Sequence, residues 1–158
     1  MRVEILSGVS GSGKSTYAWS RTKEIPKSGV VSADLYFCFN GEYNFDPKKL
    51  SEAHGWCFRK FIEELRRNPH GLDLVIVDNT NTTEAEIAPY VLGAQAYEAE
   101  VEIITFFCEP EIAHKRNVHN VSLESVMRQH ERFKIRTFPP WWKVVPFGWG
   151  KDETANSL

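Results

Sequence analysis

The residues most suited to chemistry form a glycine-rich run near the start of the 158-residue chain. Residues 8–15 read Gly-Val-Ser-Gly-Ser-Gly-Lys-Ser and fit the pattern G-x-x-x-x-G-K-[ST]. Glycines let successive backbone N–H groups converge on phosphate oxygens without a Cβ in the way. The residues expected to bind the nucleotide phosphates are those of this motif and its successor: Gly8, Ser10, Gly11, Ser12, Gly13, Lys14, Ser15 and Thr16.

Two of these side chains and one distant carboxylate are predicted to serve ATP and Mg²⁺. Lys14 is expected to reach the β- and γ-phosphates, and the Ser15 hydroxyl to ligate Mg²⁺. Asp78 ends the apolar run 72–77, where a carboxylate would lie near the metal and its waters. Capping of the following loop is the other interpretation of Asp78. Asn79 stands where a hydrolytic motor usually has a water-activating carboxylate, which favours transfer to a bound acceptor over hydrolysis.

A second carboxylate, Asp34, is predicted to act on the acceptor. It follows a short apolar run, and the ends of parallel strands face one common crevice, so Asp34 would look across at the γ-phosphate. A carboxylate there can take the proton of an attacking hydroxyl group. The alternative is a loop Asp bonded to its own backbone. With the glycine-rich motif, Asp34 predicts a phosphotransferase, a kinase with an alcohol group as acceptor.

These residues must be positioned by an α/β domain, because apolar runs alternate with helical patterns along the chain. We expect a P-loop kinase fold with a parallel β-sheet of about five strands flanked by helices. It would form a single domain over residues 1–158, with 148–158 as a flexible tail. Strands are expected at residues 3–6, 30–33, 72–77, 101–108 and 143–146, and helices at 14–24, 47–68, 83–97, from 109, and at 122–135. Residues 35–46 are expected to form a polar, aromatic loop.

Composition limits the classes of partner. The formal net charge is −2, which argues against a protein that coats nucleic acid through bulk charge. No apolar stretch is long enough for a signal sequence or a membrane span, so a cytoplasmic protein is expected, in the host-cell cytoplasm if it is viral. Cys38, Cys57 and Cys108 lack metal-ligand spacing and are expected to be reduced thiols in a core. The sequence leaves the oligomeric state open.

Five stretches together resemble the small polynucleotide 5′-hydroxyl kinases of phages and their eukaryotic relatives. They are GVSGSGKST (8–16), SADLYF (32–37), GEYNFDPKKLSEAHGWC (41–57), VIVDNTNTT (75–83) and KRNVHNV (115–121). The resemblance implies ATP and Mg²⁺ as cofactors and a nucleic-acid 5′-hydroxyl end as acceptor. It implies that Asp34 is the general base. It also implies that Arg116 begins the lid and touches adenine or phosphate, and that Tyr36 and Asn79 lie on the substrate side.

The sequence departs from this family at two positions. Phe37 and Asn120 stand where the phage enzymes have arginines. Arg128 and Arg132 lie four residues apart on the last long helix and should share a face. With Arg116 they are candidates for neutralising the transferred phosphoryl group. A solvated helix face is an equal alternative for Arg132.

Aromatic residues gather in two places, at residues 36–45 and 139–142. Nucleobases stack on such rings with roughly 1–3 kcal/mol each, which would suit a single-stranded end. Core packing beneath loops is the competing interpretation. Two other functions also stay open: a P-loop kinase for another hydroxyl acceptor (a nucleoside, modified base or small metabolite), and a nucleotide-binding module without turnover.

Overall fold

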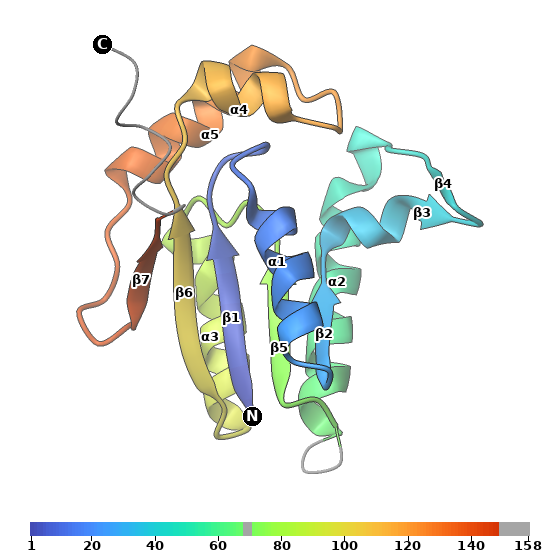
Figure 1. The fold of residues 1–158 in the computed structure, drawn as a ribbon, viewed down its shortest axis with the longest axis vertical. Helices are drawn as coiled ribbons and strands as arrows, with labels where there is room; N and C mark the ends of the chain where they lie inside the picture. Colours follow the sequence, from blue (N-terminus) through green and yellow to red (C-terminus); the bar gives the residue numbers. More distant parts are fainter. Residues whose placement is uncertain (68–70, 149–158) are drawn as a thin grey trace.

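The chain builds a five-stranded parallel sheet, as the sequence predicts. A computed structural model describes residues 1–67 and 71–148. The strands are β1 (Arg2–Ser7), β2 (Ser28–Val31), β5 (Leu74–Asp78), β6 (Glu100–Phe106) and β7 (Val144–Phe147), in the spatial order β2-β5-β1-β6-β7. All four pairings are parallel, so the carboxyl ends of the strands share one edge of the sheet (Figure 1).

The two central strands are apolar because helices or side chains cover both of their faces. In β5, Leu74, Val75, Ile76 and Val77 are all fully buried, and in β1 the same holds for Val3, Ile5 and Leu6. A parallel strand buried on both faces needs such a continuous apolar run. The register aligns Leu6 of β1 with Asp78 of β5, which brings the end of β5 beside the start of the glycine-rich turn.

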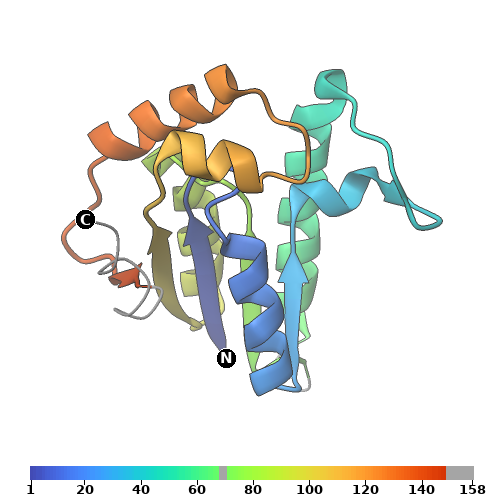
Figure 2. The same ribbon diagram turned by 45° about the horizontal axis from the view of Figure 1, so that its top comes forward.

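Helices cover the sheet and close its upper edge. Helix α1 (Lys14–Glu24) lies on one face, and α2 (Leu50–Arg66) and α3 (Glu84–Ala96) lie on the other (Figure 1). Helices α4 (Pro110–Arg116) and α5 (Leu123–Ile135) cross above the carboxyl ends of the strands (Figure 2). Helix α3 begins with a capping box. Thr83 accepts from the backbone of Glu86, whose side chain accepts from Thr83 in return. Within residues 1–67 and 71–148, no helix is long and apolar enough to cross a membrane.

The segment predicted as a loop at residues 35–46 is more ordered than expected. It contains the 3₁₀ helix η1 (Ala33–Phe37) and an antiparallel hairpin, β3 (Cys38–Phe39) with β4 (Glu42–Tyr43). Asn40 and Gly41 make its two-residue turn with φ of 49° and 83°. Two positive φ values suit the tight hairpin turn that Asn-Gly favours.

Other boundaries also differ from the expected ones. Strand β2 begins at Ser28 and ends at Val31, because the next residues start η1. The expected helix at 47–68 is a 3₁₀ turn, η2 (Pro47–Lys49), followed by α2. Residue 68 and the expected tail beyond residue 148 lie outside the described residues. Of the three thiols expected in a core, Cys57 is buried but Cys38 is exposed on the hairpin.

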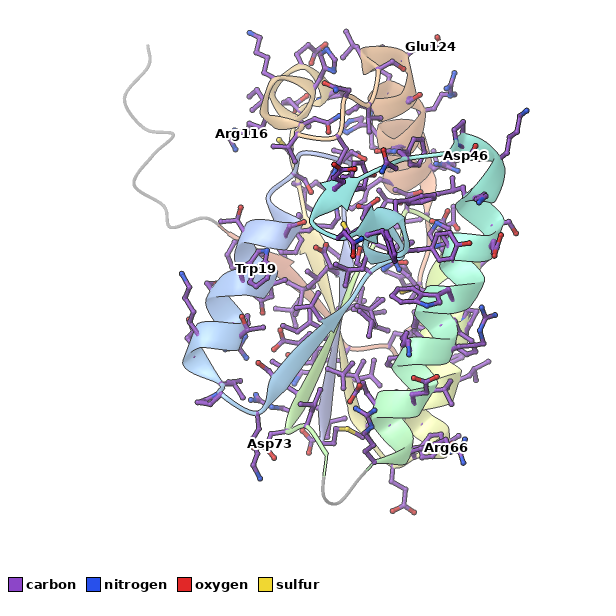
Figure 3. All side chains as sticks on the ribbon, turned by 90° about the vertical axis from the view of Figure 1, so that its right-hand side faces the viewer. Trp19, Asp46, Arg66, Asp73, Arg116 and Glu124 are labelled. Atoms are coloured by element: carbon purple, nitrogen blue, oxygen red, sulfur yellow. The ribbon has the colours of Figure 1, made fainter. Side chains whose placement is uncertain are left out.

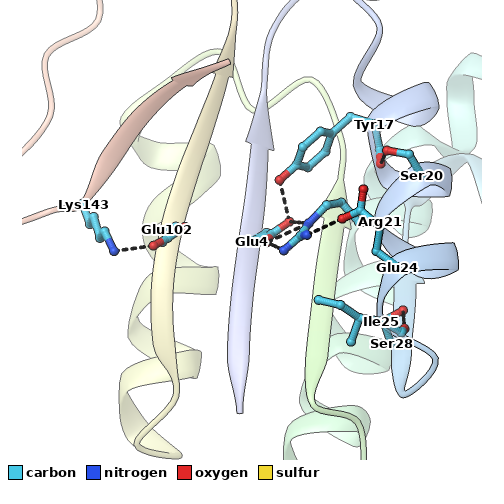
Figure 4. Close-up of polar contacts among 9 residues, drawn as sticks. All are labelled: Glu4, Tyr17, Ser20, Arg21, Glu24, Ile25, Ser28, Glu102 and Lys143. Atoms are coloured by element: carbon cyan, nitrogen blue, oxygen red, sulfur yellow. Dashed lines mark hydrogen bonds and ion pairs between the residues drawn. The ribbon is translucent and has the colours of Figure 1, made fainter. Parts of the chain in front are cut away.

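Below the site, a buried carboxylate ties β1 to α1. Glu4 is 3% exposed and accepts hydrogen bonds from Tyr17 at 2.9 Å and from Arg21 at 2.8 Å (Figure 4). Arg21 also pairs with Glu24 one turn along the helix. A buried charge needs such partners, so this network fixes α1, and with it the residues at the start of that helix, against the sheet.

Candidate active site

The glycine-rich turn between β1 and α1 forms a tight cradle. Gly11 and Gly13 have φ of 83° and 97°, a region that favours glycine. A Cβ on Gly11 would lie 2.0 Å from the carbonyl oxygen of Ala113 in α4. The turn therefore depends on glycine both for its conformation and for the close approach of the helix above it.

One hydroxyl of the cradle fits the phosphate that the motif predicts. Ser12 Oγ is buried and has no hydrogen-bond partner among the described residues. An orphaned buried hydroxyl costs free energy unless a ligand satisfies it. The start of α1 also turns its free N–H groups, and the positive end of the helix dipole, toward the turn. The residues present thus suit an anion such as a nucleotide phosphate.

Lys14 is the first residue of α1. Its side chain is buried, and its Nζ donates a 2.8 Å hydrogen bond to the carbonyl oxygen of Val9. Burial lowers the pKa of Lys14 to about 8, while the charges of Asp78 and Asp34 oppose the shift. A phosphate in the cradle would place a negative charge next to the buried Lys14 ammonium.

Ser15 and Asp78 come together as a candidate Mg²⁺ site. Burial raises the pKa of Asp78, and the Lys14 charge and a hydrogen bond with the Ser15 side chain oppose this shift. Hydroxyl and carboxylate oxygens are the ligands that Mg²⁺ prefers, usually together with waters and substrate phosphates. Ser15 and Asp78 therefore fit the metal that the motif predicts.

Asp34 presents a half-exposed carboxylate near this cradle. Ser32 caps η1 by accepting from the backbone N–H of Asp34, which fixes the residue at the first turn. Its Oδ1 accepts a hydrogen bond from the Tyr43 hydroxyl at 3.3 Å. His119, from the loop between α4 and α5, places Nε2 3.8 Å from Oδ2. The hairpin and the loop between α4 and α5 therefore both approach the Asp34 carboxylate. We call α4, α5 and the loop between them the lid.

Two residues predicted on the substrate side, Asn79 and Tyr36, make contacts within the protein. Asn79 is 7% exposed, and its Oδ1 accepts from the backbone N–H of Ala33 at 2.8 Å. Its amide nitrogen donates to Cys57 and Tyr90. Asn79 therefore fixes the backbone of Ala33, the residue before Asp34.

Tyr36 likewise turns toward α2 rather than toward the cradle. Its ring packs edge-on against Trp56, and a hydrogen bond with Glu52 raises the pKa of its hydroxyl. Trp56 and Glu52 both belong to α2. These contacts anchor η1 on that helix.

A cavity of about 790 Å³ extends from the cradle beneath the lid. The side chains around it combine apolar, aromatic and basic groups: Thr16, Phe107, Ile112, Arg116, Val118 and His119. Phe107 is 70% exposed and Ile112 is 46% exposed, so apolar surface is open to a base. Arg116 ends α4 at the opposite end of the molecule from Asp73 (Figure 3).

The other two predicted arginines lie elsewhere on the lid. Arg128 bonds to Glu124 and to Ser125 on its own helix. Together with Arg132, it lines a separate groove along α5. Of the three predicted arginines, Arg116 is the one that borders the nucleotide cavity.

The two departures from the resembling kinases also have a structural basis. Phe37 is 4% exposed and packs in the core beneath the hairpin. Asn120 has φ of 54°, a turn conformation that Asn tolerates better than most residues.

Three further residues of the site are not marked by any pattern in the sequence: Gln129, Tyr43 and His119. Gln129 of α5 accepts from the backbone N–H of Ser10 at 2.8 Å and so ties the lid to the cradle. No local pattern marks it, because the two residues lie 119 positions apart. Tyr43 and His119 lie in stretches that carry the family resemblance, yet only the folded chain shows that they flank Asp34.

Comparison with known proteins agrees with this architecture. Human NEDD4-binding protein 2 is 35% identical over 134 residues, which cover 82% of this chain and 7% of that protein. A solved sugar kinase from a Janibacter species is 16% identical with a TM-score of 0.61, covering 93% of this chain and 84% of that one. The Pnkp1/Rnl/Hen1 RNA repair complex contains a chain that is 18% identical with a TM-score of 0.66, covering 84% of this chain and 44% of that one.

The two solved structures share the fold, which is that of P-loop kinases. The chain spans a small fraction of its human relative, so the likeness concerns one region of that protein. Residues 3–136 match the family model described as the AAA domain, a range that includes the cradle, Asp34, Asp78 and the lid. The chain belongs to this AAA-domain family of P-loop proteins.

Proposed function

We propose that the protein is an ATP-dependent kinase that transfers the γ-phosphate to a 5′-hydroxyl end of a polynucleotide. The observation that carries this proposal is the half-exposed carboxylate of Asp34 beside the phosphate cradle, within the electrostatic reach of Lys14. A hydrolase needs an activated water, whereas this carboxylate is open to an acceptor entering from the hairpin side.

The cradle binds and orients the triphosphate. Backbone N–H groups of Gly11 and Gly13 and those at the start of α1 hold the β- and γ-phosphates, and the Lys14 ammonium lies against them. Mg²⁺, held by Ser15 and near Asp78, would neutralise charge on the phosphate oxygens. Arg116 approaches the nucleotide from the lid, and Arg128 or Arg132 would need the lid to move before reaching it.

Asp34 acts as the general base in the transfer. The acceptor O–H proton moves to the Asp34 carboxylate as the 5′-oxygen forms a bond to the γ-phosphorus. The bond between that phosphorus and the β,γ-bridging oxygen breaks, and its electron pair leaves with ADP. Asp34 then releases its proton to solvent. Such transfer depends mainly on positioning and charge stabilisation.

A polynucleotide acceptor is supported by the stretches around Asp34 and residues 41–57, which resemble polynucleotide kinases. The structural likeness to a chain of an RNA repair complex agrees with it. The likeness to a sugar kinase supports the second candidate, a kinase for another hydroxyl acceptor such as a nucleoside, modified base or metabolite. A nucleotide-binding module without turnover is the third.

The test is transfer from γ-labelled ATP to 5′-hydroxyl RNA and DNA strands. Asp34→Asn should reduce transfer by at least about 100-fold, the size of a typical general-base contribution, while ATP binding persists. Asp73→Asn is the matched control, because that exposed carboxylate lies at the far end of the sheet (Figure 3). Lys14→Ala should weaken both binding and transfer.

The outcomes separate the candidates. Transfer to sugars or nucleosides but to no 5′-hydroxyl strand would replace the polynucleotide assignment with the second candidate. ATP binding with background turnover on every acceptor would indicate the binding module. Equal losses in Asp34→Asn and Asp73→Asn would exclude Asp34 as the base.

A further inference from the structure

Three neighbouring rings lie beside Asp34. Tyr43, whose hydroxyl bonds to Asp34, has the centroid of the His119 ring 4.8 Å and the centroid of the Phe45 ring 6.5 Å from the centroid of its own ring. The rings of Tyr43 and Phe45 are nearly parallel, with an interplanar angle of 11°. We call Tyr43, Phe45 and His119 the aromatic row.

The aromatic row is exposed, although it rests on the core. Tyr43 is 36% exposed and Phe45 is 49% exposed. Phe37 beneath them is 4% exposed and meets both rings edge-on, at 6.3 and 5.1 Å. One buried ring therefore holds two exposed rings in place. Such rigid aromatic surface can bind a ligand with little loss of side-chain freedom.

Several other aromatic side chains of the two predicted clusters are placed differently. Tyr36 packs on Trp56, and Trp142 packs on Phe138. Phe39 is 75% exposed but pairs across the hairpin with Glu42, whereas Tyr43 pairs with Cys38. Because adjacent residues of a strand point to opposite faces, Phe39 lies on the other face of the hairpin from Tyr43.

Local charge favours recognition of a base over recognition of phosphates. The segment 42–49 has two lysines, Lys48 and Lys49, and two carboxylates, Glu42 and Asp46, so its net charge is zero. Phosphate tracking needs an excess of cations and makes affinity fall steeply with salt. Aromatic faces bind every nucleobase and need no such excess.

We propose that the aromatic row is a stacking site for the base of the 5′-terminal nucleoside of a single-stranded acceptor. This inference rests on the proposed function. Tyr43 links the two parts of the site, because its hydroxyl contacts the general base while its ring belongs to the row. A base stacked on the row holds its own sugar, and thus the 5′-hydroxyl, beside Asp34.

The experiment compares two single-stranded 5′-hydroxyl acceptors that differ only in whether the 5′-terminal nucleoside carries its base. With the wild-type protein, kcat/KM should be about 5- to 100-fold higher for the strand with the base. Phe45→Leu, which keeps apolar volume over Phe37 but removes the flat ring, should bring this ratio close to one. Phe39→Leu, on the opposite face of the same hairpin, should leave the ratio unchanged.

Tyr43→Phe provides a second variant that keeps the ring. It should lower the rate on both acceptors while preserving the ratio between them, which a merely unfolded hairpin would not do. Binding of a fluorescent 5′-hydroxyl strand can be followed by anisotropy without ATP. Phe45→Leu should weaken this binding, whereas Phe39→Leu should not, and the affinity should depend only weakly on salt.

A ratio of one in the wild-type protein, or equal effects of Phe45→Leu and Phe39→Leu, would overturn the stacking site even if strands are phosphorylated. Strand binding that depends on Phe45 without any transfer would retain the stacking site and reject the kinase proposal. A steep salt dependence would assign the contact to phosphates instead of the base.

Discussion

The Tyr43 hydroxyl lies 3.3 Å from Oδ1 of Asp34, so the hairpin and the candidate general base are joined by a hydrogen bond. Burial, and then the charge of Asp34, raise the pKa of Tyr43 to about 12. Tyr43 therefore keeps its proton through the neutral range and can donate it in the hydrogen bond to Oδ1 of Asp34. The other oxygen, Oδ2, lies 3.8 Å from Nε2 of His119.

Tyr43→Phe is predicted to reduce kcat by about tenfold. A hydrogen bond to a charged group is worth roughly 1.5–3 kcal/mol, and part of this should remain because water can replace the phenol. Steady-state kinetics on a 5′-hydroxyl strand measure the change. In an Asp34→Asn background the same substitution should add little, because the two residues act as one unit. Additive losses would show that Tyr43 acts independently.

Gly11→Ala should abolish ATP binding, whereas Gly41→Ala should leave it intact. Both glycines have φ of 83°, so both substitutions cost about 1–2 kcal/mol of backbone strain. Only at Gly11 would the new Cβ meet another backbone, 2.0 Å from the carbonyl oxygen of Ala113. Calorimetric titration with ATP, alongside urea unfolding, separates strain from clash. Normal ATP affinity in Gly11→Ala would mean that α4 can move aside freely.

Lys14→Met should stabilise the nucleotide-free protein near neutral pH. The pKa of Lys14 falls from 10.5 to about 8 on folding, so the unfolded chain binds more protons between these values. Burial of the charged Lys14 side chain therefore destabilises the folded state by about 3 kcal/mol below pH 8, at 1.36 kcal/mol per pKa unit. This destabilisation fades as the pH rises toward 10.5. Urea unfolding in EDTA at several pH values should show this gain shrinking above pH 8. A pH-independent difference would contradict it.

Arg116→Ala should raise the KM for ATP by about tenfold, because the guanidinium borders the nucleotide cavity. Arg128→Ala is the matched control on the same lid. Its side chain is engaged by Glu124 and Ser125, so nucleotide kinetics should stay within about twofold. A larger effect of Arg128→Ala would show that α5 rearranges to bring this arginine to the phosphates.

Arg21→Met should lower the free energy of unfolding by about 3–5 kcal/mol, since it leaves the buried carboxylate of Glu4 without its cation. Lys60→Met removes an exposed partner of Glu63 and should cost less than about 0.5 kcal/mol. Thermal or urea unfolding of the two variants gives the comparison. Similar small losses in both would show that Tyr17 alone satisfies Glu4.

The sequence predicted those parts of the molecule that local patterns determine. The bounds of α1 follow from the end of the glycine-rich turn, and the central strands follow from their continuous apolar runs. Strand β2 was misplaced by two residues because its pairing with β5, rather than its own polarity, sets its start at Ser28. The hairpin was missed although Asn40-Gly41 signals a tight turn, since its strands are only two residues long.

In the candidate site, too, local patterns predicted some features and long-range contacts determined others. Parallel strands end at a common edge, so a carboxylate after β2 and one at the end of β5 had to approach the cradle after β1. The sequence could not show that Asn79 is buried, because its partners Ala33, Cys57 and Tyr90 come from three other segments. Nor could it show which arginine borders the cavity beside the cradle, since the position of the lid depends on long-range packing.

The strand order affects how the sheet forms during synthesis on the ribosome. Strand β1 is made first, but Arg2 pairs with Leu74 and with Glu100, so both neighbours are translated much later. At roughly 5–20 residues per second, β1 waits about 5–20 s before Phe106 completes β6. The apolar segment that ends in the cradle is therefore the longest-exposed part of the nascent sheet, and a substitution there is expected to lower yield before it touches activity.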